Sequence, residues 1–377
     1  MHPALTALLA ARPVDAEAWH SWWDQLEHRT LGPADTDRAQ AAALLAGLTT
    51  RLPDPDTLAA LVTSLTERTP HPGPAHPHSV NIVGTGGGPA TFNLSTAAAL
   101  TAAAIGIPVV KTGSRAYTSA AGSVDLLERL GITLTSGHAA TADHLARHNI
   151  AFAGPHVYPP PLTRLARTLY PLTLKPFGAF LNTLGPLLAT VPVTAQLTGV
   201  STPAALDALR PLAARLPART VWLAHNRTGA DELLPFADNT LHTPTGTVHL
   251  PAGCVAPDSG TLADLAPHPG DLTGHFLRAL AGQAGTTATR TIALNAAALA
   301  LASGRHTHWN TAYDAALDAL ADGTPRALAE RLATARPARP AAPETPAAPA
   351  APAPPAAPAA RTAAPDPAAR RPEATRA

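Results

Sequence analysis

Residues 81–132 read NIVGTGGGPATFNLSTAAALTAAAIGIPVVKTGSRAYTSAAGSVDLLERLGI. This pattern predicts two successive units, each with a short apolar strand, a loop that contains glycine, and a helix that begins at hydroxyl residues. Such a loop lets backbone N–H groups approach a phosphate, and the helix end favours negative charge. Two of these loops in tandem predict chemistry on a small molecule with two phosphate-bearing ends.

The rest of the chain predicts an α/β fold with a mainly parallel sheet and a smaller helical part. Apolar strands are expected at 80–83, 108–110, 150–152 and 220–224, with helical patterns between them. The N-terminal part, to about residue 68, should be helical. In residues 53–68, Leu58, Leu61, Val62 and Leu65 share one face, and Asp56 is the expected N-cap.

Three regions follow from this pattern. Residues 1–70 are expected to form a helical domain, to which a helical, Pro-interrupted segment at about 160–200 returns. Residues 78–334 should form an α/β domain that binds the phosphorylated substrate. Residues 335–377 are rich in Ala and Pro and hold no Leu, Ile, Val, Met or aromatic residue, so this tail is expected to be disordered.

Composition narrows the function classes. The 377-residue chain has a formal net charge of +1, which argues against nucleic acid or an acidic membrane as a partner. A single cysteine, Cys254, excludes an intramolecular disulfide and fits a reducing, cytoplasmic compartment. The N-terminus has no basic region before its apolar run, so a helix is expected there rather than a signal peptide. No apolar run is long enough to predict a membrane span.

The first glycine loop, residues 84–88 (GTGGG), holds more glycine than a tight turn needs. It is followed by Asn93, Ser95 and Thr96 at the start of an alanine-rich helix, which favours an anion site. Ser95 could also be an ordinary N-cap, and the two roles are compatible.

The second loop begins with Lys111, one of only two lysines in the chain; the other is Lys175. A compact ammonium suits a phosphate where a forked guanidinium would not fit. Residues 111–123 are either a phosphate clamp, extended by Ser119, Gly122 and Ser123, or a solvated loop with two cations.

Adjacent carboxylates, Asp231 and Glu232, follow the last predicted strand. Near a diphosphate they would bind Mg²⁺, which takes oxygen ligands from one or two carboxylates, phosphates and water; otherwise they are solvated surface. His138, His144 and His148 show no zinc pattern and are interpreted as surface residues. Residues 182–186 (NTLGP) are interpreted as a turn that ends a helix.

Together these segments resemble the anthranilate phosphoribosyltransferase family, which shares its fold with pyrimidine nucleoside phosphorylases. The segments that carry the resemblance are VGTGGGPATFNLST, VVKTGSRAYTSAAGSVDLLERLGI, FLNTLGPLL, GADEL and NAAALALASG. It covers about residues 5–332 and is strongest at 81–132. It implies a small helical domain, a larger α/β domain, 5-phosphoribosyl diphosphate (PRPP) as donor, Mg²⁺ as cofactor, and a homodimer.

The resemblance also implies site residues, carried over by position. The PRPP site would comprise Gly84, Thr85, Gly86, Gly87, Asn93, Ser95, Thr96, Lys111, Ser119, Gly122 and Ser123. Metal would be held by Ser95, Asp231 and Glu232.

Several features depart from the family pattern, most of them on the acceptor side. Gly88 stands where the glycine loop usually ends in Asp, and Thr112 and Ser114 replace the His and Asn of a Lys-His-Gly-Asn loop. Tyr158-Pro159 stands where His-Pro is usual. The Arg expected about ten residues before the FLNTLGPLL asparagine is missing, and the stretch 170–181 holds only Lys175. Ser114, Tyr158 and Lys175 are therefore the expected acceptor-side residues.

The resulting prediction is a PRPP-dependent glycosyltransferase with anthranilate as the default acceptor and tryptophan biosynthesis as the default pathway. The altered residues leave open another amine or hydroxyl acceptor, for example in secondary metabolism. A hydroxyl acceptor would need a base, for which only Tyr158 or His156 can be suggested. The alternatives are a pyrimidine nucleoside phosphorylase, disfavoured because residues 111–123 lack a Ser-Gly-Arg-Gly-type sequence, and a non-catalytic nucleic-acid-binding protein, disfavoured by the net charge.

Overall fold

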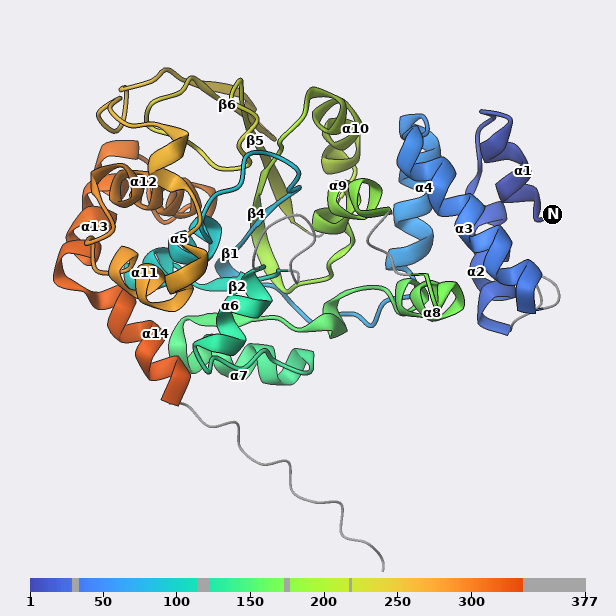
Figure 1. Ribbon diagram of the computed structural model, residues 1–377, viewed down its shortest axis with the longest axis horizontal. Helices are drawn as coiled ribbons and strands as arrows, with labels where there is room; N and C mark the ends of the chain where they lie inside the picture. Colours follow the sequence, from blue (N-terminus) through green and yellow to red (C-terminus); the bar gives the residue numbers. More distant parts are fainter. Residues whose placement is uncertain (29–33, 114–121, 173–176, 217–218, 335–377) are drawn as a thin grey trace, which may run out of the picture. The chain divides into compact units, whose positions relative to one another are not determined.

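The computed structural model describes residues 1–28, 34–113, 122–172, 177–216 and 219–334. A seven-stranded sheet, in the order β3-β2-β1-β4-β5-β6-β7, organises the larger part (Figure 1). Its strands are β1 (His76–Gly84), β2 (Val109–Lys111), β3 (Ile150–Phe152), β4 (Val193–Gly199), β5 (Thr220–Asn226), β6 (Asn239–Thr243) and β7 (Gly246–Leu250). The first five run parallel and the last two antiparallel. The predicted mainly parallel α/β fold is confirmed.

The sequence missed three strands. Strand β4 lies inside the segment predicted to be helical up to about residue 200, and that part of the prediction is wrong. Its inward positions include Gln196 and Thr198, both fully buried, so the segment lacks the apolar run of a buried strand. The β6–β7 hairpin was missed because Thr and His dominate its exposed residues.

Helices rich in small residues cover the sheet on one side. The helices of this part are α5 (Leu94–Ala104), α6 (Ser123–Arg129), α7 (His138–His148), α10 (Pro203–Ala214), α11 (Leu272–Ala279), α12 (Thr286–Ala302), α13 (Trp309–Asp322) and α14 (Thr324–Thr334). Helix α5 packs against α12, α13 and α14 and is buried along nearly its whole length. Because α5 and α12 are rich in alanine, their backbones can approach closely, and α5 is held firmly at the carboxyl end of β1.

A second core joins the N-terminal helices to two later ones. These helices are α1 (Pro3–Leu9), α2 (Ala16–His28), α3 (Ala34–Thr50), α4 (Pro55–Thr66), α8 (Pro160–Leu169) and α9 (Gly178–Leu188). The core is built around Trp19, Trp22 and leucines of α3, α4 and α9, and it reaches α10 and β5. Residues Met1–Arg336 form one compact unit, so the division at about residue 70 stays a prediction. The predicted disordered tail lies outside the described residues.

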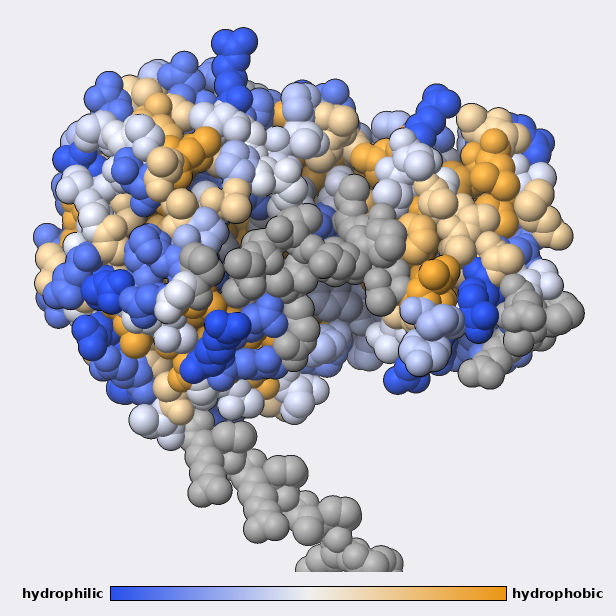
Figure 2. Space-filling view, viewed as in Figure 1, coloured by the Kyte–Doolittle hydropathy of each residue, from blue (hydrophilic) through white to orange (hydrophobic). Residues whose placement is uncertain are grey.

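The surface of the N-terminal helices is partly apolar. Figure 2 shows apolar side chains gathered over these helices, on the right of the view, whereas hydrophilic side chains are more frequent over the larger part. Met1 and Leu9, at the two ends of α1, are among the exposed large hydrophobic residues, with 76% and 55% of their surface accessible. The apolar residues of this part are therefore not all used in its core.

Two local predictions are corrected. Asp54, not Asp56, caps α4: its Oδ1 accepts hydrogen bonds from the N–H groups of Asp56 (3.1 Å) and Thr57 (3.0 Å), because Pro55 occupies the first helical position. Residues 182–186 do not end a helix but lie inside α9, which continues to Leu188. Burial of Leu184, Leu187 and Leu188 outweighs the proline, which sits in the last turn. Across the described ranges, no helix is both long and apolar enough to cross a membrane.

Candidate functional site

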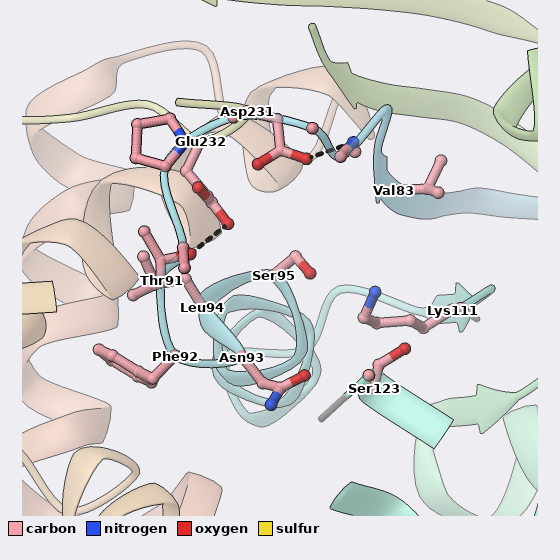
Figure 3. A pocket seen from close by; sticks show the side chains of 18 of the residues that line it. Val83, Thr91, Phe92, Asn93, Leu94, Ser95, Lys111, Ser123, Asp231 and Glu232 are labelled. Carbon is pink, nitrogen blue, oxygen red and sulfur yellow. Dashed lines mark hydrogen bonds between the residues drawn. The ribbon is translucent and has the colours of Figure 1, made fainter. Parts of the chain in front are cut away.

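A cavity of about 230 Å³ opens where β1 and β2 end and α5 begins. Parallel strands place such a crevice at their carboxyl ends. Figure 3 shows Asp231 and Glu232 on one side, Lys111 and Ser123 on the other, and the Ser95 hydroxyl between them. The predicted PRPP and metal residues that line this cavity are Gly84, Gly86, Gly87, Asn93, Ser95, Lys111, Gly122, Ser123, Asp231 and Glu232.

The glycine loop is shaped by close contacts with the loop that follows β5. Gly86 (φ +61°) and Gly87 (φ +81°) have positive φ, which side chains disfavour. The N–H of Gly86 donates to Asp231 Oδ2 at 2.9 Å, and a Cβ on Gly84 would lie 2.0 Å from the same oxygen. A Cβ on Gly88 would lie 2.1 Å from the carbonyl oxygen of Gly229. The loop therefore has no room at residue 88 for the side chain that the family pattern usually carries.

The start of α5 leaves two polar side chains available to a ligand. Asn93 takes the N-cap position but makes no capping hydrogen bond with its side chain. Ser95 is the second helical residue, so it is not the N-cap, and its hydroxyl points into the cavity (Figure 3). The start of the helix thus offers the cavity an amide, a hydroxyl and the positive end of its dipole.

Two predicted PRPP residues do not line the cavity. Thr85 is 3% exposed, and its Oγ1 accepts a hydrogen bond from the backbone N–H of Ser201 (3.2 Å), so it joins the loop to the end of β4. Thr96 is fully buried in α5. Ser119 lies outside the described residues, as do the acceptor-side residues Ser114 and Lys175.

Lys111, the last residue of β2, is 4% exposed. Its Nζ donates to the carbonyl oxygens of Ile82 and Thr112, both at 3.1 Å. Burial lowers the pKa of Lys111 to about 8, while the carboxylates of Glu232 and Asp231 act in the opposite direction. This ammonium is therefore desolvated and aimed at the space where an anion would compensate it.

The carboxylate pair fits a divalent cation. Glu232 is buried, and burial, followed by the neighbouring Asp231, raises its pKa well above the usual range. Its Oε1 accepts a hydrogen bond from Thr91 Oγ1 (3.3 Å), but its buried Oε2 has no hydrogen-bond partner among the described residues. A buried, unpartnered carboxylate oxygen beside a second carboxylate suits Mg²⁺. Within the described ranges, no group of three or more His, Cys, Asp or Glu side chains could hold a metal ion, so hydroxyl, phosphate and water oxygens would complete the coordination.

A buried polar network behind the cavity was not predicted. Asn81 Nδ2 donates to Thr112 Oγ1 and to Gln196 Oε1, both at 3.1 Å, and Thr112 N–H donates back to Asn81 Oδ1 at 3.1 Å. Since the carbonyl of Thr112 accepts from Lys111 Nζ, this network fixes one of the two acceptors that hold the ammonium. Its only sequence signal was the presence of Asn and Gln inside strands.

The two suggested bases lie away from the cavity lining. Burial raises the pKa of the Tyr158 phenol, against the effect of a hydrogen bond with Thr112, so Tyr158 stays protonated. The His156 ring packs against His138 with centroids 4.9 Å apart, and its Nε2 lies 3.4 Å from Thr141 Oγ1. His138, His144 and His148 are half-buried.

Comparison with known proteins identifies relatives. Residues 76–326 match the α/β domain of the glycosyl transferase family. An anthranilate phosphoribosyltransferase of Methylorubrum extorquens (strain PA1) is 33% identical over 230 residues, 61% of this chain and 66% of that protein, just under two thirds of its length. One from Parasynechococcus marenigrum (strain WH8102) is 33% identical over 294 residues, 76% of this chain and 83% of that protein.

Solved structures share the fold. The anthranilate phosphoribosyltransferase of Thermus thermophilus is 28% identical, with a TM-score of 0.71 over 89% of this chain and 99% of that one. The enzyme from Saccharomyces cerevisiae, solved in complex with PRPP and Mg, is 20% identical, with a TM-score of 0.74 over 88% and 96%. At 20% identity, the similarity to the Saccharomyces cerevisiae enzyme shows a shared fold only.

Proposed function

Because the chain belongs to the anthranilate phosphoribosyltransferase family, we propose that it transfers the 5-phosphoribosyl group of PRPP to an acceptor amine and releases diphosphate. The observation that carries this proposal is the pairing of a buried ammonium, Lys111, with a buried carboxylate pair across a single glycine-lined cavity. A ligand that carries both phosphate groups and a divalent cation would compensate both sets of charges.

In the proposed reaction, the lone pair of the acceptor nitrogen forms a bond to C1 of the ribose. The C1–O bond breaks, its electron pair leaves with diphosphate, and the nitrogen loses a proton. The loop N–H groups and Lys111 would hold the phosphate oxygens, while Ser95, Asp231 and Glu232 would hold Mg²⁺. Mg²⁺ supplies neutralisation of the charge that develops on the leaving diphosphate. Positioning and charge stabilisation therefore account for most of the catalysis, and an aromatic amine needs no strong base.

We propose anthranilate as the default acceptor, with tryptophan biosynthesis as the pathway. One observation favours a different amine or hydroxyl acceptor: Thr112 and Tyr158 replace the usual histidines, and Tyr158 does not line the cavity. The acceptor side is thus rebuilt, while the donor side keeps its pattern. A homodimer and a cytoplasmic location stay predictions.

The test is diphosphate release from PRPP and Mg²⁺, with and without anthranilate, together with anthranilate fluorescence. Release that depends on anthranilate, with a matching loss of fluorescence, supports anthranilate as the acceptor. PRPP binding or slow hydrolysis without loss of fluorescence supports another acceptor. Failure to bind PRPP in the presence of Mg²⁺ would overturn the proposed function, and phosphorolysis of uridine or thymidine would replace it with nucleoside phosphorylase activity.

A further inference from the structure

A second cavity, of about 660 Å³, lies at the opposite end of the sheet. It is bounded by α10, by the first residues of β4 and β5, and by the β6–β7 hairpin, elements that neighbour one another in Figure 1. Its lining shares no residue with the cavity at the carboxyl ends of β1 and β2. It is therefore a separate site, and its volume is in the range of small-molecule pockets.

Arg219 is a buried cation that lines this cavity and also a neighbouring one, which Glu67 borders as well. It is 8% exposed and lines the cavity just before β5 begins. Its Nη2 donates to the carbonyl oxygens of Pro186 (3.3 Å) and Leu187 (3.4 Å) at the end of α9, but its buried Nε has no hydrogen-bond partner among the described residues. Burial lowers the pKa of Arg219 to about 10. Among the described residues, this buried guanidinium has carbonyl partners but no ion pair with a carboxylate, so an anion would stabilise it.

The other titratable side chains that line the cavity are basic. Exposed Arg210 of α10 and half-buried His242 of β6 also line it, and none of its described lining residues carries a carboxylate. His242 lies in the positive field of Arg210, His225 and His249, which adds to the effect of burial in lowering its pKa. The cavity therefore attracts an anion, and no acidic side chain of its described lining competes for the site.

The other lining residues indicate what kind of molecule would carry the anionic group. Ala213, Leu216, Val221 and Leu223 form an apolar surface, and threonines at residues 194, 220, 243 and 247 add hydroxyls. Inorganic phosphate would leave the apolar surface uncovered. An organic anion with a compact hydrocarbon body would cover it and place its charged group against the arginines.

We propose that this cavity, bounded by α10, β5 and the β6–β7 hairpin, binds a small organic carboxylate through Arg219 and Arg210. The carboxylate accepts hydrogen bonds from the two guanidinium groups, and its hydrocarbon part contacts the apolar residues of the lining, such as Ala213 and Leu216. The proposal does not depend on PRPP chemistry, because the two cavities share no side chain.

The test is calorimetric titration of the full chain with cyclohexanecarboxylate, using the neutral cyclohexanecarboxamide as a matched probe. The variant Arg210→Gln removes an exposed charge and should fold normally, whereas Arg219→Met also removes hydrogen bonds to the end of α9 and is checked by circular dichroism first. Arg305→Gln, an exposed arginine between α12 and α13, controls for net charge. Lys111→Met removes the cation of the first cavity.

Support requires saturable binding of the carboxylate to the wild type, Arg305→Gln and Lys111→Met alike, with affinity lower by about tenfold in Arg210→Gln. The carboxamide should bind much more weakly than the carboxylate. No saturable binding to the wild type would overturn the proposal. So would binding that Lys111→Met abolishes and Arg210→Gln leaves unchanged, because it would place the probe in the first cavity.

Discussion

Gly86 donates its backbone N–H to Asp231 Oδ2 at 2.9 Å, which joins the glycine loop to the carboxylate pair across 145 residues of sequence. The contact is possible because Gly84, two residues earlier, has no side chain: a Cβ there would lie 2.0 Å from the same oxygen. The phosphate-binding loop and the proposed metal ligands are therefore positioned by one another.

Gly84→Ala should disrupt the contact between the glycine loop and Asp231. The added methyl group must displace Asp231, so we expect Mg²⁺ affinity to fall by about tenfold or more and stability to fall by about 1–3 kcal/mol. Calorimetry with Mg²⁺ and PRPP, and urea unfolding, measure the two effects. Gly137→Ala, where a Cβ would have no heavy atom within 4 Å, is the control. Equal Mg²⁺ affinity in both variants would contradict the argument.

Mg²⁺ binding should release a proton from Glu232. Burial and Asp231 raise the pKa of Glu232 well above its usual range, so this carboxyl holds its proton to a higher pH than an exposed glutamate does, and a cation that binds there displaces the proton. Titrations with Mg²⁺ and PRPP in two buffers of different ionisation enthalpy should therefore differ in apparent heat. In Glu232→Gln that difference should shrink, and an equal difference in wild type and variant would refute the assignment.

Because of Lys111, the affinity for PRPP and the stability of the fold should depend on pH in opposite directions. Burial lowers its pKa in the folded state to about 8 from 10.5, so between these values the unfolded chain binds more protons, and the contribution of Lys111 makes stability rise with pH. Donor affinity should fall over the same interval, because the amine loses the charge that faces the phosphate. Urea unfolding and PRPP titrations across this interval test both slopes. Lys111→Met should reduce both slopes.

Gly88→Asp should not improve the metal site, although the family usually carries Asp there. The new Cβ would lie 2.1 Å from the carbonyl oxygen of Gly229, so one loop must shift. We expect a loss of about 1–3 kcal/mol in stability and no gain in Mg²⁺ affinity. Thermal denaturation and Mg²⁺ titration check this expectation. Tighter Mg²⁺ binding without loss of stability would show that the loop accommodates the carboxylate.

Asn81→Leu should weaken PRPP binding indirectly, through the buried polar network behind the cavity. The substitution leaves the Thr112 N–H and Gln196 Oε1 without their partner, at a cost of about 1–3 kcal/mol. Because Thr112 holds Lys111 Nζ, we expect KM for PRPP to rise more than kcat falls. Gln196→Leu is the matched control, since Gln196 belongs to the same network but bonds to Asn81, Pro186 and Thr198 rather than to Thr112. An equal change in KM in both variants would contradict this argument, because general destabilisation of the protein would then explain the effect.

The donor side could be predicted because its signals are local. A glycine run after an apolar strand, hydroxyl residues at a helix start and a lysine at a strand end are each visible within a few residues. Ser95 and Lys111 line the cavity as that pattern suggests, whereas Thr85 and Thr96 have the right chemistry but are turned into the protein. Which way a threonine faces depends on packing against β4 and α12, which a local pattern does not contain.

The features that could not be predicted from the sequence depend on contacts between residues far apart in the chain. Gln196 and Thr198 made β4 look unlike a strand. Buried Gln196 has hydrogen-bond partners on α9 and β1, and Gln196 itself donates to buried Thr198. The sequence did not distinguish Arg219 from the many other arginines. Its buried position depends on the carbonyl groups at the end of α9, and the cavity that it lines is completed by a hairpin later in the chain. In both cases a polar residue occupies a buried position because its hydrogen-bond partners come from elsewhere in the chain.

The scarcity of lysine has a practical consequence. With a pKa of about 8, Lys111 exists partly as the free amine near neutral pH, and Lys175 is the only other lysine of the chain. An acylating or reductively methylating reagent thus has few targets besides the N-terminus. Mass spectrometry of the modified peptides could then follow ligand occupancy directly, because a phosphate seated against Lys111 would protect that amine from the reagent.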